Sequence, residues 1–169
     1  MKTALFLALM VLCVPARAES YVAIVADCHD GDTCKILKGE EIVRCRIASI
    51  DAPEMAFPGR WPEQPYAADS RLEIEAMVGG QTVYVVDHGA EEVRHGKGIP
   101  RHVCDLVAMV GGQAMNVGEA MVARGAAWAY PEFDRDDPLP MLEAMARQDH
   151  RGLWATPAVP PWRWRRGER

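Results

Sequence analysis

The stretch DGDTCKILKGEEIVRCRIASIDAPE, residues 30–54, contains two turn signals and several carboxylates. Asp30-Gly31 is the strongest kind of short hairpin signal, and Lys38-Gly39-Glu40 marks a second reversal of the chain. The runs around these turns are rich in β-branched and aliphatic residues, so strands are predicted over 21–25, 33–37 and 42–50. Because the third run leads back toward the first turn, we expect Asp51 to lie near Asp32 and to share one cation with it.

The remainder of the chain predicts a small fold of strands and helices. Apolar residues follow a helical pattern over 66–78, and Gly79-Gly80 ends it. The other predicted elements are strands over 81–86 and 101–110 and helices over 117–124 and 138–151. Five short strands with a helix before the fourth match a Greek-key barrel of the OB type. The length of 169 residues and the 49% hydrophobic content fit one such domain.

The N-terminus has the pattern of a secretory signal peptide. Met1-Lys2 is positively charged, an apolar run covers 4–14, and Ala16-Arg17-Ala18 supplies small residues before a cleavage point. We therefore predict a signal peptide over 1–18 and a secreted or periplasmic mature chain that begins at Glu19 and has no membrane anchor. That chain carries 17 basic against 24 acidic residues, a net charge of −7. Proteins that hold duplex DNA tightly usually carry a basic face, so tight binding of duplex DNA is not expected.

The motif Asp30-Gly31-Asp32-Thr33, followed at this distance by the run 46–54, resembles the active-site signature of the staphylococcal (thermonuclease-type) nuclease family. Weaker likenesses cover the strand that begins at Arg101, the helix over 117–125 and the segment 151–154. The resemblance implies a five-stranded OB-fold Greek-key barrel with three α-helices over 19–155. It also implies a Ca²⁺-dependent endonuclease that hydrolyses DNA or RNA with low sequence specificity and leaves 3′-phosphate ends.

Asp32 and Asp51 are the predicted metal ligands. Ca²⁺ takes six to eight oxygens from carboxylates, carbonyls and water, and both side chains are hard oxygen donors of that kind. The resemblance adds the backbone carbonyl of Ala52 as a third ligand. Ala52 stands where the best-known member of the family has threonine, so a hydroxyl near the metal-bound water is absent. This difference affects the expected rate but not the ion site.

The predicted catalytic residues are Arg46, Arg101 and Glu54. Each guanidinium can hydrogen-bond the non-bridging phosphate oxygens and stabilise the charge of the transition state. Glu54 lies just beyond a proline turn, and by analogy with the family it deprotonates the attacking water as general base or orients it electrostatically. Arg94 and Lys97 are the alternatives to Arg101, because a shift in the loop before the strand changes the alignment.

Four cysteines remain once residues 1–18 are removed, and in an oxidising compartment they allow three pairings. Cys34 and Cys45 are equidistant from the second turn, so we predict the bond Cys34–Cys45 together with Cys28–Cys104. Free buried thiols are the alternative. A zinc site built on Cys28-His29 and on 102–104 is disfavoured, because neither pair has the usual ligand spacing.

Two further patterns have structural explanations. His88, His95 and His102 recur every seven residues, but in a loop and its flanking strands this spacing gives no common face, so no metal site is expected. The tail over 156–169 interleaves tryptophan with arginine, a pattern suited to stacking on bases and contacting phosphates. We favour instead a proline-anchored extension that packs its tryptophans on the domain or stays disordered.

Each acid and arginine could also be purely structural, because aspartate and glycine favour turns for backbone reasons. Asp30 alone is expected to have that role and to support the turn. For the others, the structural explanations would all have to hold at once over a spaced set.

Two other functions stay open: an inactive OB-fold module that binds single-stranded nucleic acid or a protein partner, and a metal-dependent phosphodiesterase for a small substrate. Retention of Asp32, Arg46, Asp51 and Glu54 argues against the first. We expect a monomer.

Overall fold

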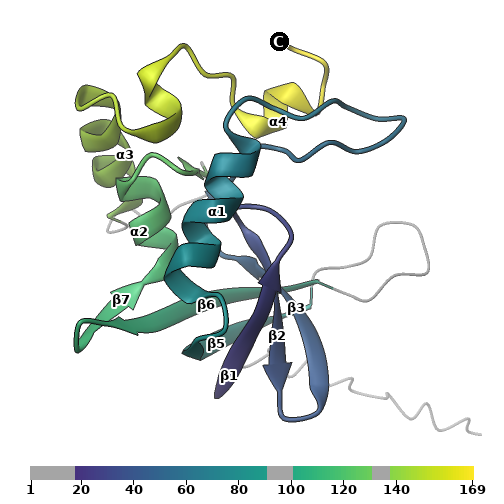
Figure 1. The fold of residues 1–169 in the computed structure, drawn as a ribbon, viewed down its shortest axis with the longest axis vertical. Helices are drawn as coiled ribbons and strands as arrows, with labels where there is room; N and C mark the ends of the chain where they lie inside the picture. Colours follow the sequence, from purple (N-terminus) through teal and green to yellow (C-terminus); the bar gives the residue numbers. More distant parts are fainter. Residues whose placement is uncertain (1–17, 91–100, 131–137) are drawn as a thin grey trace, which may run out of the picture.

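The structure is a computed structural model that describes residues 18–90, 101–130 and 138–169. At its centre five strands form a closed barrel, and a sixth strand extends one edge (Figure 1). The strands of this sheet are β1 (Glu19–Cys28), β2 (Thr33–Lys38), β3 (Glu41–Ile47), β5 (Thr82–Ala90), β6 (Arg101–Val110) and β7 (Gln113–Asn116). Their order is β3-β2-β1-β5-β6-β7, and an additional pairing of β3 with β6 closes the barrel.

Two hairpins place the first three strands side by side, as the turn signals predict. In the antiparallel pair β2–β3, Thr33 lies opposite Arg46. Closure of the barrel requires β3 and β6 to run parallel, and there Arg44 lies opposite Arg101. The predicted OB-type barrel is confirmed, and its closure brings the start of β6 beside the two hairpins.

The third strand ends earlier than the sequence predicts. β3 stops at Ile47 instead of continuing to Ile50, because the chain turns through Ala48 and through Ser49, which has a left-handed φ of 66°. The chain then enters β4 (Ile50–Asp51), which pairs with β8 (Trp128–Ala129) in a separate two-stranded sheet. This kink takes Asp51 out of the barrel sheet.

The helices gather at one end of the barrel (Figure 1). They are α1 (Ala67–Val78), α2 (Val117–Ala123), α3 (Leu139–Gln148), a 3₁₀ turn η1 (Gly152–Ala155) and α4 (Pro161–Trp164). The three predicted helices are confirmed. Helix α2 starts where expected because the Asn116 side chain accepts a hydrogen bond from the Glu119 N–H at 3.1 Å and so caps it. None of the helices in the described ranges is long and apolar enough to cross a membrane.

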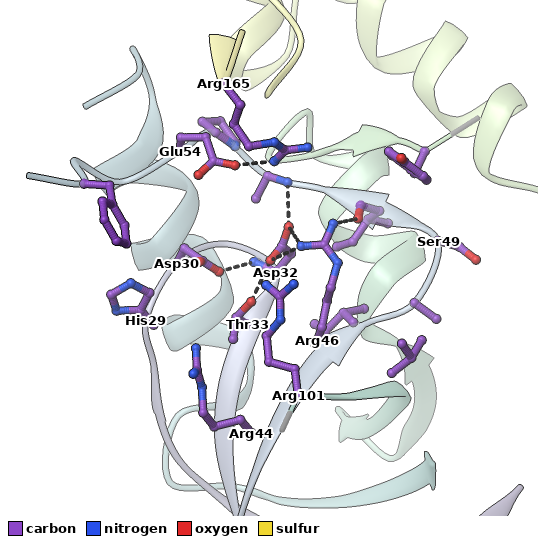
Figure 2. A pocket seen from close by; sticks show the side chains of 18 of the residues that line it. His29, Asp30, Asp32, Thr33, Arg44, Arg46, Ser49, Glu54, Arg101 and Arg165 are labelled. Carbon is purple, nitrogen blue, oxygen red and sulfur yellow. Dashed lines mark hydrogen bonds and ion pairs between the residues drawn. The ribbon is translucent and has the colours of Figure 1, made fainter. Parts of the chain in front are cut away.

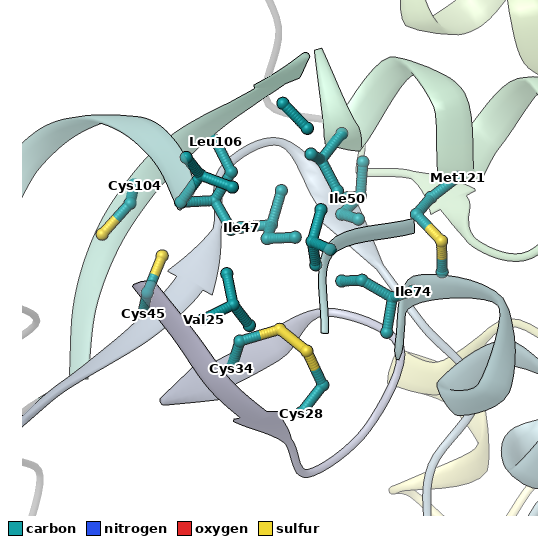
Figure 3. Packing of buried hydrophobic residues seen from close by; sticks show 14 of the residues in the cluster. Val25, Cys28, Cys34, Cys45, Ile47, Ile50, Ile74, Cys104, Leu106 and Met121 are labelled. Atoms are coloured by element: carbon teal, nitrogen blue, oxygen red, sulfur yellow. A yellow bond between two sulfur atoms is a disulfide. The ribbon is translucent and has the colours of Figure 1, made fainter. Parts of the chain in front are cut away.

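The apolar core fills the barrel and continues beneath the helices. Figure 3 shows Val25 and Leu106 of the barrel packed toward Ile74 of α1 and Met121 of α2. A second cluster includes Trp128 and Trp154, whose rings meet edge to face with centroids 5.2 Å apart. Burial of this apolar surface, which contributes about 25 cal/mol per Å² removed from water, is the main interaction that fixes the helices to the barrel.

The predicted disulfides are wrong, and one different bond is present. Cys28 and Cys34 form a disulfide with their Cα atoms 3.9 Å apart, while Cys45 and Cys104 are buried free thiols (Figure 3). Cys34 does face Cys45 across β2–β3, as predicted, but it also faces Cys28 across β1–β2. Cys28 and Cys34 lie opposite each other at the end of the β1–β2 pair, where the His29 N–H donates to the Thr33 carbonyl, and this places their sulfur atoms within bonding distance.

Candidate active site

A cavity of about 710 Å³ opens at the rim of the barrel, between the β1–β2 turn, the end of β3 and the C-terminal segment (Figure 2). The charged residues that line it are Asp30, Asp32, Arg44, Arg46, Glu54, Arg101 and Arg165, and Ala52 lines it as well. Asp51 is completely buried against this lining. The structure therefore brings every sequence-predicted site residue to one place and adds Arg165.

Asp32 is fixed at the last residue before β2 begins. Its backbone N–H donates to Asp30 Oδ1 at 3.1 Å, which confirms that Asp30 supports the turn. The Asp32 carboxylate accepts from the Thr33 hydroxyl at 2.8 Å and from the Ala52 N–H at 3.0 Å. With 4% of its surface exposed, Asp32 is a buried carboxylate whose orientation is set by contacts from both ends of the 30–54 stretch.

Gly31 lets the β1–β2 turn approach its neighbours closely. A Cβ atom at this position would lie 1.9 Å from Ser70 Oγ and 2.8 Å from Ala52 Cβ. The Ser70 hydroxyl cannot easily move aside, because it is buried and donates to the Ala126 carbonyl at 2.6 Å. The glycine of the hairpin signal is thus needed for close packing of Asp32 against α1 and the segment that bears Asp51.

Arg46 holds both aspartates. Its Nη1 atom lies 3.2 Å from Asp32 Oδ2 and 3.3 Å from Asp32 Oδ1 (Figure 2). Its Nη2 atom lies 3.1 Å from Asp51 Oδ1. The register explains this position, because Arg46 lies opposite Thr33, the residue after Asp32. The two carboxylates are therefore within reach of one guanidinium, so Asp51 does lie near Asp32. Their sharing of a metal ion stays a prediction.

Arg165 is a site residue that sequence reasoning did not identify. Its Nη2 atom lies 2.8 Å from Asp51 Oδ2, and its Nη1 atom lies 3.2 Å from Asp51 Oδ1 and also donates to Glu54 Oε1. The signal available was the alternation of tryptophan and arginine in the tail, which indicated contacts with bases or phosphates but no particular acid. The structure directs one of these arginines inward.

The C-terminal segment that carries Arg165 is anchored to the domain. Trp164 has 8% of its surface exposed, and its indole N–H donates to the Pro62 carbonyl at 3.0 Å. Upstream, the Gln64 side chain donates to the Val159 carbonyl at 2.5 Å and accepts from the Glu54 N–H at 3.0 Å. The segment thus packs its tryptophan on the domain, the first of the two arrangements that we favour for the tail.

Burial and charge shift the pKa values of three groups in the cavity. Burial, with the neighbouring Asp32 carboxylate, raises the pKa of Asp30 to about 8. Burial raises the pKa of Glu54 as well, although the bond from Arg165 opposes this change. For Arg165, burial disfavours the charged form, but its bonds to Asp51 and Glu54 outweigh burial and raise its pKa. Arg165 is therefore a permanent cation in the site.

Arg101 and Arg44 reach the cavity from the barrel side. They lie opposite each other where β3 and β6 run parallel, and Figure 2 shows both side chains directed toward the acids from the side opposite Arg165. The position of Arg101 in the cavity agrees with its predicted alignment. The alternatives Arg94 and Lys97 lie outside the described residues.

The predicted metal ligands form an oxygen-only set. Among the described residues no three histidine, cysteine, aspartate or glutamate side chains converge as a metal-binding group. Asp32 and Asp51 are buried carboxylates, and such hard oxygen donors match the chemistry of Ca²⁺, which completes its coordination with carbonyls and water. Cys28 cannot be a ligand of the disfavoured zinc site, because its sulfur is bonded to Cys34.

Two of the histidines contact separate aspartates. His88 lies 2.8 Å from Asp105, and His102 lies 2.8 Å from Asp87. The two pairs share no carboxylate. His95 lies outside the described residues.

Comparison with known proteins gives the family. The family model described as "Staphylococcal nuclease homologue" matches residues 44–156. The chain belongs to the staphylococcal nuclease family. A protein named "Uncharacterized endonuclease" from Escherichia coli O157:H7 is 35% identical over 154 residues, which cover 86% of this chain and 90% of that protein. "Protein ParB" of Escherichia coli is 35% identical over 170 residues, 98% of this chain and 90% of its own length. "Micrococcal nuclease" of Shigella flexneri is 30% identical over 165 residues, which cover 95% of this chain and 88% of that protein. The predicted family is confirmed.

Proposed function

We propose that this chain is a Ca²⁺-dependent nuclease that hydrolyses phosphodiester bonds of DNA or RNA with low sequence specificity. The observation that carries the proposal is the arrangement of Asp32, Arg46 and Asp51 beside Glu54 in one cavity. Relatives with "endonuclease" and "Micrococcal nuclease" in their names match nearly the whole chain and support the same reaction.

Asp32, Asp51 and the carbonyl of Ala52 are the groups that would hold Ca²⁺. When bound, this ion supplies neutralisation of the phosphate charge and a template for the attacking water. The burial of both aspartates favours such a role, because buried carboxylates need cationic partners to remain ionised. Arg46 already supplies part of this compensation and keeps the two side chains oriented.

Arg46 and Arg101 stabilise the phosphoryl oxygens, and Glu54 takes a proton from the attacking water. A guanidinium is a planar fork that matches phosphate oxygens and stays charged at every working pH. Its contacts strengthen as the pentacovalent transition state gathers charge, which accelerates the reaction. The raised pKa of Glu54 suits a general base, since a more basic carboxylate accepts a proton more readily.

The substrate approaches past two aromatic side chains, exposed Phe57 and half-buried Trp61. Phe57 and Trp61 line the cavity and face each other with ring centroids 5.4 Å apart. Stacking of bases on such rings does not depend on sequence. Unpaired bases are free to stack on these rings, so we propose preferred action on single-stranded regions. Export to the periplasm or the exterior and a monomeric state complete the proposal.

The test is a divalent-ion activity assay on denatured DNA and on RNA. The chain without residues 1–18 should degrade polymer with Ca²⁺ and stop when a chelator is added. Glu54→Gln should reduce turnover at least about a hundredfold with substrate affinity nearly unchanged, because only the proton acceptor is lost. Glu63→Gln, an exposed glutamate in the same loop, is the matched control and should retain full activity.

The assay also separates the alternatives. No digestion of either polymer over a range of Ca²⁺ and pH, combined with retained binding of single strands, would indicate a binding module. Hydrolysis of a small phosphodiester without digestion of polymers would indicate the phosphodiesterase. Full activity of Glu54→Gln would remove Glu54 from the mechanism.

A further inference from the structure

The Arg165 guanidinium lines the cavity, but the proposed mechanism gives it no role. Asp51 has no exposed surface, and among the described residues its carboxylate oxygens accept from the side chains of Arg46 and Arg165. Arg165 supplies two of these three bonds and reaches Glu54 with the same Nη1 atom. One guanidinium thus spans a predicted metal ligand and the predicted general base.

The placement of Arg165 follows from the fold and not from these ion pairs alone. Pro161 and Trp164 are buried, and α4 begins at Pro161. Trp162 meets the Tyr130 ring edge to face with centroids 5.8 Å apart. Contacts other than those of Arg165 therefore anchor both ends of this helix. They fix the position of the backbone at Arg165, and so the place that its side chain reaches.

Glu54 needs such a partner to stay over the cavity. Within the described ranges, Arg165 is the one side chain that donates to the Glu54 carboxylate. Without it, the nearby charge of Asp51 would repel Glu54, and the side chain, already 19% exposed, has open solvent to turn into. Arg46 does not replace Arg165, because its bonds go to Asp32, Asp51 and the Ile50 carbonyl.

We propose that Arg165 is a positioning residue of the active site, whose guanidinium holds the Glu54 carboxylate beside Asp51 for attack on the phosphodiester. The C-terminal segment is then a part of the catalytic apparatus, and the site is complete only when this segment is docked. The inference rests on the proposed nuclease function and adds a residue to it.

Arg165→Gln tests the role, with Arg166→Gln as matched control. Arg166 has a side chain that is 61% exposed, pairs with Glu168 and does not line the cavity. On denatured DNA with saturating Ca²⁺, Arg165→Gln should lower kcat about thirtyfold or more with KM changed less than about threefold, since misplacement of a catalytic group by about 1 Å costs on the order of a hundredfold. Arg166→Gln should equal the wild type. Arg165→Lys, which keeps the charge but loses the fork, should recover part of the rate.

A double-mutant cycle with Glu54→Gln distinguishes positioning of Glu54 from a general structural effect. If Arg165 acts through Glu54, Arg165→Gln should cost less than about threefold in the Glu54→Gln background. Calorimetric titration of each variant with Ca²⁺ alone gives a readout independent of activity. The affinity of Arg165→Gln should be equal to or tighter than that of the wild type, because a cation beside Asp51 is removed.

Three results would overturn the inference. These are an unchanged kcat in folded Arg165→Gln, an equal loss in both backgrounds of the cycle, or Ca²⁺ affinity weakened about tenfold, which would place the effect at the ion site. In the first case the wild type still digests DNA, so the nuclease function stands and only the role of Arg165 falls. Absence of activity in the wild type itself would refute the proposed function, and this inference with it.

Discussion

Adding one methyl group at Gly31 should disrupt both the stability of the fold and its candidate site. In Gly31→Ala the new Cβ would lie 1.9 Å from Ser70 Oγ and 2.8 Å from Ala52 Cβ. Relief of these contacts requires movement of α1 or of the segment that follows β4. Overpacking of this kind costs about 1–3 kcal/mol. Loss of the buried bond from Ser70 to the Ala126 carbonyl adds about 1–3 kcal/mol. The free energy of unfolding should therefore fall by about 2–6 kcal/mol in all.

Urea unfolding followed by tryptophan fluorescence measures the change, because buried Trp128 and Trp154 report on the packed state. Ser70→Gly removes the nearer obstacle. The double variant Gly31→Ala/Ser70→Gly should therefore lose about 1–3 kcal/mol less free energy of unfolding than the two single variants lose together. Activity should fall in Gly31→Ala even where the protein is fully folded, since Ala52 donates to Asp32. A change below about 0.5 kcal/mol in the single variant would refute the close-packing argument.

Three other predictions concern the site and the core. Arg46→Lys should lower kcat about a hundredfold on denatured DNA, because one ammonium cannot hold two carboxylates and a phosphate as the fork does; a loss under about threefold would count against this role. Thiol titration of the chain 19–169 at pH 8 should find no reactive thiol in the native protein, two after unfolding and four after unfolding with reduction of the disulfide. The native thiols should not react because Cys45 and Cys104 are buried, and because contact with the Cys104 thiol, together with burial, raises the pKa of Cys45. Rapid native labelling would contradict it. Trp61→Ala should raise KM for single strands about fivefold or more without changing kcat, since stacking contributes about 1–3 kcal/mol per base; equal KM values would exclude stacking on this ring.

The two hairpins could be predicted because their signals are local, whereas the barrel topology was predicted from the family resemblance. The turns at Asp30-Gly31 and at 38–40 fix the two hairpins, and the register of β2 with β3 then places Arg46 opposite the start of β2. The break after Ile47 was not predictable, because the strand-like pattern continues through it to Ile50. It depends on Ser49 adopting a left-handed φ and on the pairing of β4 with β8, in which Ile50 lies opposite Ala129, far away in sequence.

The disulfide shows a different limit of sequence reasoning. Position relative to the turn at 38–40 correctly placed Cys34 opposite Cys45, but the same cysteine faces Cys28 on its other neighbour strand. A central strand has two neighbours, and sequence spacing alone does not say which neighbour supplies the sulfur. In the structure the partner of Cys34 is Cys28, with the two Cα atoms 3.9 Å apart.

Arg165 could not be predicted because it depends on long-range packing. Its contacts with Asp51 and Glu54 span 114 and 111 residues of sequence. The tail pattern indicated phosphate or base contacts, and only the docking of Trp164 on the loop at Pro62 reveals that an arginine turns toward the acids. Sequence motifs therefore identified the part of the site that comes from neighbouring hairpins, and missed the part that is added from the chain end.

The chain as a whole is negatively charged, whereas positive charge prevails in its cavity, and this difference affects substrate binding. The whole chain carries −5, whereas four arginines line the cavity against three acidic residues there and the buried Asp51. Since the pKa of Asp30 is raised to about 8, that carboxyl is largely neutral at pH 7, and the arginines outnumber the remaining ionised acids. A dication would add to this local excess. Phosphate is therefore attracted at the reacting centre and repelled over the rest of the surface, so few counterions are released on binding and the affinity for any one stretch of polymer stays low. If the proposed low sequence specificity holds, such weak binding favours release of products as well as entry of substrates.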